Sequence, residues 1–283
     1  MDAVAESLTL SPTELNELRR AKWVLENPSF AIRLANVIGL PIETGFAMLP
    51  KGWSHIVHRS VHLALNKTLR VAMKSLRNHA PLPSSDSLHR VIVGTSGAVG
   101  GAFGLASLPF ELPLSTAVML RSIADIARSE GYALNDVETH LACLAVFALG
   151  SRRTKERESE NQYWIIRAGL ARAVSEATTY LTNRGIVCET APVMIRLVAA
   201  IAARFGVIVS EHVAAKAIPL VGAATGSAFN LVFINHFQRM ARGHFVVKRL
   251  EKQYGVDTIE SVYRSIAMPM SKKEISRFTA QSI

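Results

Sequence analysis

The chain is poor in cysteine. Cys143 and Cys188 are the only two among its 283 residues, too few for a disulfide framework or a four-thiolate metal site. Cys143 lies in an apolar run of helical character, where buried thiols are common. The two cysteines therefore indicate a reducing compartment.

The N-terminal segment lacks the features of a secretory signal. It reads MDAVAESLTLSPTE, with acidic residues where a signal would be basic and without an unbroken apolar core. We therefore expect a cytoplasmic chain.

Charge is also scarce, and it is unbalanced. Charged residues make up 19% of the chain and hydrophobic residues 49%, which is more apolar than an ordinary soluble enzyme. The formal net charge of +10 favours an anionic partner, either nucleic acid or acidic lipid. Zinc-finger spacing, an RNA-binding aromatic signature and a recognition helix are missing, so the sequence favours lipid.

Alternating strands joined by hairpin turns are missing too, while helix signals are frequent. Ser11, Pro12 and Glu14 form a capping box with proline at the first helical position. Similar caps are expected at Asn135 with Glu138, Asp257 with Glu260, and Ser271 with Glu274. We expect an all-α fold that forms a single multi-helix domain over residues 1–283.

The clearest helix is expected over residues 53–76. Its apolar positions recur at helical spacing and form one stripe, made of Val57, Val61, Leu65, Leu69, Ala72 and Leu76. The opposite side is polar and basic, which predicts a helix with one buried face.

Glycines are concentrated in two uncharged stretches, residues 91–110 and 217–238. They do not match a phosphate-binding loop, because no lysine and hydroxyl follow them and no strand precedes them. Four-residue spacing, as in Gly97 with Gly101 or Gly222 with Gly226, instead lets helices pack closely. We expect two glycine-rich apolar helical hairpins, which either pack internally or contact lipid.

The two stretches also resemble each other weakly. GGAFGL at residues 100–105 aligns with GSAFNL at residues 226–231, and each is followed about thirty residues later by a glycine, Gly131 or Gly255. This pattern is consistent with an internal duplication of a helical hairpin.

Acidic residues are missing from residues 44–85 and 212–250, although both windows are basic. Basic helices beside apolar hairpins fit an anionic membrane surface, with Trp53 at its boundary; solvated helix faces are the alternative. The expected contact residues are Arg59, Lys67, Arg70, Lys74, Arg239 and Arg242.

Some residues are candidates for chemistry. His55, His58 and His62 lie broadly on one side of the expected helix, but Arg59 among them would repel a metal ion, so we expect polar histidines that gain charge in mild acid. Glu111 and His140 are the candidate catalytic residues of an alternative, enzymatic hypothesis. Arg196 and Arg204 interrupt an apolar run and are expected to extend toward solvent or pair with carboxylates, or to form a buried anion site.

Several motifs resemble the EcsC-like family of bacterial proteins over about residues 45–265. They are GAVGGAFG followed by ELP and LRSIADIARSEG, then IPLVGAATGSAFN, ARGHF and LEKQYG. The residues that carry the resemblance are Gly97, Gly100, Gly101, Gly104, Glu111, Pro113, Arg121, Gly131, Pro219, Gly222, Gly226, Asn230 and Gly255.

The family takes its name from the third gene of an operon that encodes an ABC transporter. The resemblance therefore implies a helical protein at the inner face of the bacterial cytoplasmic membrane, accessory to a transporter or an envelope process. It carries over no cofactor and no catalytic machinery. A hydrolase with a site near Glu111 and the three histidines, and a soluble scaffold for a partner protein, are the alternatives.

Overall fold

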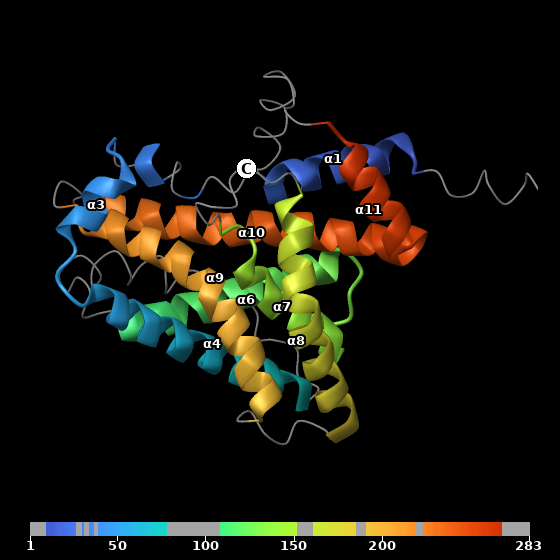
Figure 1. Ribbon diagram of the computed structural model, residues 1–283, viewed down its shortest axis with the longest axis horizontal. Helices are drawn as coiled ribbons and strands as arrows, with labels where there is room; N and C mark the ends of the chain where they lie inside the picture. Colours follow the sequence, from blue (N-terminus) through green and yellow to red (C-terminus); the bar gives the residue numbers. More distant parts are fainter. Residues whose placement is uncertain are drawn as a thin grey trace, which may run out of the picture.

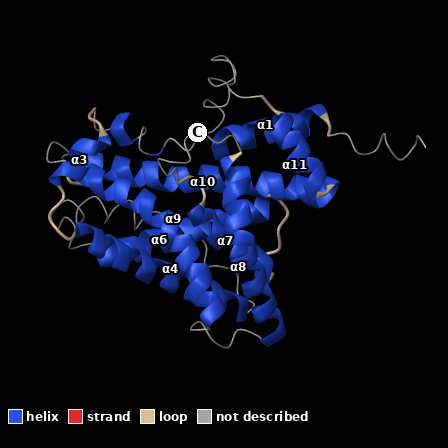
Figure 2. Ribbon diagram, viewed as in Figure 1, coloured by secondary structure: helices blue, strands red, loops and turns tan. Residues whose placement is uncertain are grey.

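The computed structural model describes residues 10–26, 30, 34–36, 39–77, 108–151, 161–184, 191–218 and 223–267. For residues 73–77, 184 and 223–229 it describes the backbone alone. Within these ranges the chain is all-α and contains no strand (Figure 2), which confirms the expected fold class. The first glycine-rich motif, Cys188, Pro219, Gly222 and the expected cap at Ser271 lie outside the described residues.

The helices follow one another along the chain with short connections. They are α1 (Pro12–Glu26), α3 (Ile42–Met48), α4 (Trp53–Arg77), α6 (Leu108–Ser129), α7 (Val137–Ala145), the 3-10 turn η3 (Val146–Ala148), α8 (Gln162–Arg184), α9 (Pro192–Lys216), α10 (Ala223–Tyr254) and α11 (Val256–Ser265).

The capping box at the start of α1 is confirmed. The Ser11 backbone N–H donates to the Glu14 carboxylate at 2.9 Å, and the Glu14 N–H donates to Ser11 Oγ at 3.2 Å. The side-chain hydrogen bond from Ser11 is the largest cause that lowers the pKa of Glu14, to about 2.

Two other expected caps are displaced by one or two residues. The N-cap of α7 is Asp136, not Asn135, because the Asp136 carboxylate accepts from the Thr139 N–H at 2.9 Å. The N-cap of α11 is Gly255, so Asp257 lies inside the first turn. A carboxylate there still interacts favourably with the positive end of the helix dipole.

The long helix α10 is the common packing partner of the fold (Figure 1). It contacts α1 and α11 on one side, and α6, α9 and η3 on the others. The pairing with α1 is antiparallel, since Tyr254 contacts Glu14 and Arg249 contacts Glu17. Below α10 in Figure 1, α4 packs against α6 and α9 and forms the lower edge.

Aromatic side chains fill the centre where α9, α10 and η3 meet. Phe147 of η3 lies 5.2 Å from Phe205 of α9 and 5.3 Å from Phe237 of α10, measured between ring centroids. All three rings are fully buried, and truncating such a ring to alanine typically costs about 3–5 kcal/mol. This cluster joins the two most apolar helices of the chain.

The predicted stripe of α4 is confirmed. Val57, Val61, Leu65, Leu69 and Ala72 are all at most 3% exposed, and the helix spans residues 53–77 rather than 53–76. The side chain of Leu76 lies outside the description.

A buried turn of α1 holds the ends of two other helices. Lys22 Nζ donates at 2.8 Å to the carbonyl oxygens of Tyr263 and Ile266, at the C-terminal end of α11. Glu26 accepts from the Tyr163 N–H, at the start of α8, and from the Tyr263 hydroxyl at 2.9 Å. Both positions match the sign of the helix dipole.

By length and composition, α9 could cross a membrane. It is nevertheless packed against α3, α4, α8, α10 and η3. Residues along its whole length are buried, from Met194 to Ala215. These contacts are those of a core helix.

Gly255 joins α10 to α11 in a conformation that suits glycine. Its φ is +87° and its ψ is 150°, a region that is essentially restricted to glycine. Gly131, which follows α6, also has a positive φ, +84°. A backbone requirement thus accounts for two of the glycines on which the family resemblance rests.

We predict that Gly255→Ala lowers the free energy of unfolding by about 1–3 kcal/mol, because an L side chain is strained in this region. The control is Gly169→Ala in α8. A Cβ at Gly169 would meet nothing within 4 Å, and alanine in a helix is about 1 kcal/mol more favourable than glycine. Urea unfolding should shift in opposite directions for the two variants, and a shift in the same direction would contradict the assignment.

Candidate functional site

The outward face of α4 is cationic. Arg59, Lys67 and Arg70 are exposed, and their spacing places them within one sector of the helix together with the exposed Leu63 and Val71. Neither α4 nor the loop before it supplies a carboxylate. This face therefore presents positive charge interspersed with apolar side chains. Lys74 is on the same helix, but its side chain lies outside the description.

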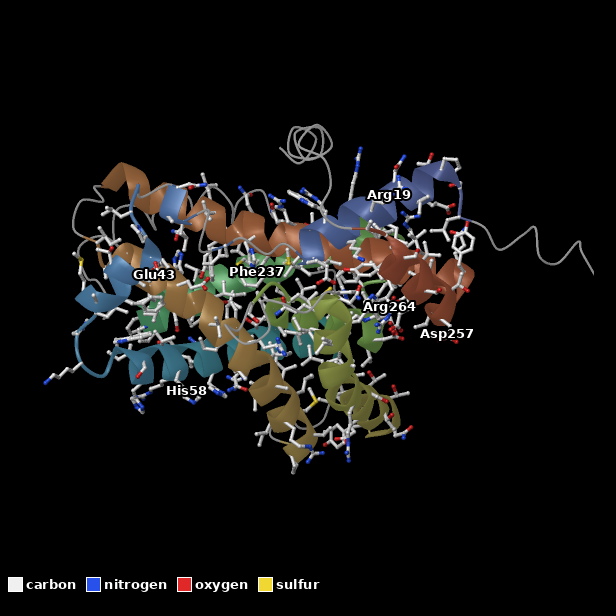
Figure 3. The ribbon with its side chains drawn as sticks, turned by 45° about the horizontal axis from the view of Figure 1, so that its top comes forward. Arg19, Glu43, His58, Phe237, Asp257 and Arg264 are labelled. Carbon is white, nitrogen blue, oxygen red and sulfur yellow. The ribbon has the colours of Figure 1, made fainter. Side chains whose placement is uncertain are left out.

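The three histidines of α4 lie beside this cationic face. His55 and His58 are exposed, and His62 is partly buried. The rings of His58 and His62 are 4.5 Å apart. Figure 3 shows His58 on the outer side of α4. Partial burial, followed by the proximity of His58, lowers the pKa of His62.

These histidines do not complete a metal site with other residues. In the ranges that the structure describes, no three His, Cys, Asp or Glu side chains gather as a candidate ligand set. The site hypothesis for His55, His58 and His62 therefore gains no fourth or third ligand from a neighbouring helix of the described part.

Glu111 and His140 belong to different surroundings. Glu111, in the first turn of α6, forms an ion pair with Lys216 at the end of α9, with Nζ and Oε1 2.5 Å apart. His140 is buried in α7, where its Nδ1 is 3.1 Å from the Asp136 carbonyl oxygen and its Nε2 has no partner among described residues. Burial lowers the pKa of His140.

The described family-motif residues mostly serve packing and helix geometry. Pro113 is buried inside α6, and Arg121 pairs with Asp125 one turn later at 3.3 Å. Gly226 and Asn230 belong to α10. The duplication and the internal hairpin packing stay predictions, because the first stretch and Gly222 lie outside the description.

Arg239 and Arg242 are far from the α4 face in the fold. They lie on α10, whose contacts with α6 place α6 between α10 and α4 (Figure 1). The Arg239 guanidinium stacks on Trp23 of α1, 5.2 Å from the ring centroid. Burial, followed by the charge of Arg242, lowers the pKa of Arg239. The expected anionic-surface residues thus divide between two surfaces.

Arg196 pairs with a carboxylate, as one of the expected alternatives has it. Its Nη2 donates to Glu176 of α8 at 2.8 Å. Arg172 of α8 reaches the same carboxylate at 2.9 Å. The polar end of α9 is thereby tied to α8.

A groove of about 360 Å³ lies between α7, α8 and α10. Its volume is within the range of small-molecule sites, roughly 300–1,000 Å³. Its apolar lining comes from Ala142, Ala145, Leu149, Leu170, Ala171 and Val174. Its polar lining comes from Glu138, Arg167, Ser175, Thr178, Thr179, His244 and Lys248.

A buried chain of hydrogen bonds sets the state of His244. Arg167 forms an ion pair with Glu251, with Nη2 and Oε2 3.0 Å apart, and also donates to the Tyr163 hydroxyl at 3.4 Å. The Tyr163 hydroxyl is 2.8 Å from His244 Nδ1. Because a guanidinium can only donate, the hydroxyl gives its own hydrogen to Nδ1, and the hydrogen of a neutral imidazole is then on Nε2.

Burial supports this assignment. It lowers the pKa of His244 well below its usual value, with the charges of Arg167 and Lys248 as further causes. Burial also raises the pKa of Tyr163, which keeps the hydroxyl protonated. His244 therefore enters the groove as a neutral donor.

Lys248 lies one turn after His244 at the rim of the groove. Its Nζ is 2.9 Å from Glu138 Oε1, and Glu138 is 61% exposed. Such an exposed ion pair contributes little stability, about 0.2–1 kcal/mol. The lysine is thus held loosely by a carboxylate that can turn into solvent.

The sequence analysis did not identify this groove. Its lining residues come from three helices separated by many residues, so neither motif nor spacing brings them together. The one available signal was the four-residue spacing of His244 and Lys248 within the second acid-free window, next to the ARGHF motif.

The buried histidines predict a pH-dependent stability. Burial lowers the pKa values of His212 and His244 well below 6.5. The unfolded chain therefore binds protons first, and stability is full above pH of about 6.5 and falls as pH decreases toward the folded-state pKa values. Urea midpoints should be higher at pH 7.5 than at pH 5.5 in this interval.

His212→Phe tests which group is responsible. His212 stacks on Phe233 with ring centroids 4.5 Å apart, so phenylalanine retains the aromatic contact. The variant should reduce the pH slope by up to about 1.4 kcal/mol per pH unit, the effect of one proton. An unchanged slope would exclude His212 as a source of the pH dependence.

The family comparison covers almost all of the described helices. The EcsC protein family matches residues 14–250, which begins earlier than the motif resemblance at residue 45 and ends before Gly255. No curated protein and no solved structure matches the chain. Because the family match runs from α1 to near the end of α10, the chain belongs to the EcsC protein family.

Proposed function

We propose that this protein binds peripherally to an anionic membrane surface, at the cytoplasmic face of the bacterial inner membrane, through the outward face of α4. The observation that carries the proposal is the exposure of Arg59, Lys67 and Arg70 on a helix without a carboxylate. Lys and Arg near an anionic bilayer each contribute about 1 kcal/mol.

Apolar side chains on the same face support contact with lipid over contact with water. Leu63 is 38% exposed and Val71 is 42% exposed, within the basic sector. Their burial at the headgroup boundary would add to the electrostatic attraction. Met48, 49% exposed just before α4, extends this apolar contribution toward α3.

Trp53 has a different role from the one expected at the sequence level. It is partly buried at the start of α4 and packs against Phe46 of α3, with ring centroids 5.7 Å apart. It therefore fixes the corner between α3 and α4. The polar edge of its indole is left near the level of the docking face, where tryptophan is favoured.

Peripheral docking fits the packing better than insertion of α9. Removing α9 from the fold would separate Phe205 from Phe147 and Phe237 and expose the core. The cationic face of α4, in contrast, can contact lipid without any rearrangement of the described helices.

Liposome sedimentation tests the proposal. Purified protein should bind vesicles of phosphatidylcholine with 30 mol% phosphatidylglycerol, should not bind pure phosphatidylcholine, and should be released by high salt. Equal binding to both kinds of vesicle would contradict electrostatic docking.

The docking face is tested by the triple variant Arg59→Gln, Lys67→Gln and Arg70→Gln. Its affinity for the anionic vesicles should fall at least about tenfold, since about 1 kcal/mol is lost for each residue. The control, Arg19→Gln, Arg172→Gln and Lys252→Gln, removes the same charge from exposed positions on α1, α8 and α10. If both triples lose the same affinity, net charge alone is responsible and the α4 face is refuted.

A further inference from the structure

We infer that the groove between α7, α8 and α10 binds a small molecule with an apolar body and one carboxylate. This inference is independent of membrane docking, because the lining residues are not on α4.

The apolar part of the ligand is set by the floor of the groove. Ala142, Ala145 and Leu149 come from the end of α7 and the turn after it, and Leu170 and Val174 face them from α8. The alanines leave the space that larger side chains would fill. An aliphatic or aromatic body of modest size would exclude water from this floor.

The anionic head is set by the α10 side of the groove. His244 has Nε2–H as its donor, and this atom has no partner in the part of the chain that the structure describes. Lys248, on the next turn, adds an ammonium group to the same wall. Two donors of which one is charged suit the two oxygens of a carboxylate.

Charge favours a carboxylate over a phosphate. Arg167 is engaged by Glu251 and by the Tyr163 hydroxyl, and its guanidinium also stacks on Trp164 at 4.7 Å. Lys248 is therefore the cation that the described lining offers to a ligand. A single ammonium neutralises a monoanion but leaves a doubly charged phosphate uncompensated.

Glu138 already shows how a carboxylate is held here. Its Oε1 is 2.9 Å from Lys248 Nζ, while the side chain remains mostly in solvent. A ligand carboxylate would replace it on Lys248, and Glu138 would return to water at little cost. The ligand gains in addition the hydrogen bond from His244 and the apolar floor.

Octanoate is the probe, because it combines an apolar chain with one carboxylate. Isothermal titration calorimetry with the full-length protein should show saturable binding of octanoate. Octan-1-ol and octylamine, which have the same chain without the carboxylate, should bind at least about tenfold more weakly. Absence of octanoate binding at millimolar concentration, or equal binding of octan-1-ol, would overturn the inference.

Variants separate the head from the apolar part. Lys248→Met retains the aliphatic stem and should weaken octanoate binding about tenfold without changing octan-1-ol binding. Glu138→Gln removes the competing carboxylate and should strengthen octanoate binding by up to about fivefold. An unchanged affinity in Lys248→Met that retains its helical circular dichroism would refute the assigned head site.

Occlusion of the groove provides a test that does not alter the charged wall. Ser175 is exposed on α8 and lines the groove, so Ser175→Phe should abolish octanoate binding without disturbing the core. Asn183→Phe, at an exposed α8 position outside the lining, is the matched control and should bind normally. If Ser175→Phe binds octanoate like the control, the ligand occupies another surface.

Discussion

The buried turn of α1 that carries Lys22 and Glu26 is the contact on which the rest of the structure depends. A lysine and a glutamate that are nearly inaccessible to water would be strongly unfavourable without partners. Lys22 therefore donates to the last carbonyls of α11, and Glu26 accepts from the first turn of α8 and from Tyr263. One turn thus satisfies the free ends of two helices that are more than seventy residues apart in sequence.

The position of α8 then determines the groove. Once Glu26 fixes the start of this helix at Tyr163, the next turn brings Arg167 to Glu251 of α10. Tyr163 reaches His244 of the same helix. Each buried polar group in this chain has a partner, and its removal would leave a buried donor or acceptor unsatisfied. The network therefore holds α8 against α10 and also defines which nitrogen of His244 carries the hydrogen.

Local features were predictable from the sequence, and tertiary features were not. The apolar stripe of α4 and the capping box at Ser11 depend on residues within two turns of each other, and both are confirmed. The cap at Asn135 was wrong because Asp136 competes for the same role one residue later. The groove combines residues of three helices that have no shared period, and Tyr163 and His244 are 81 positions apart. Only the folded arrangement brings them together.

The net charge of the chain is a poor guide to its partner, because cations are used in different ways. Arg249 of α10 contacts Glu17 of α1 and Glu130 after α6, and Lys216 contacts Glu111. Their charge is largely neutralised where it lies, and it contributes to the packing of helices. On α4 the basic residues are grouped on a face to which the helix itself adds no carboxylate. Attraction to a charged surface decays within about 10 Å at 0.1 M salt, so the local separation of acids from bases, rather than the sum of charges, selects the surface that meets an anionic partner.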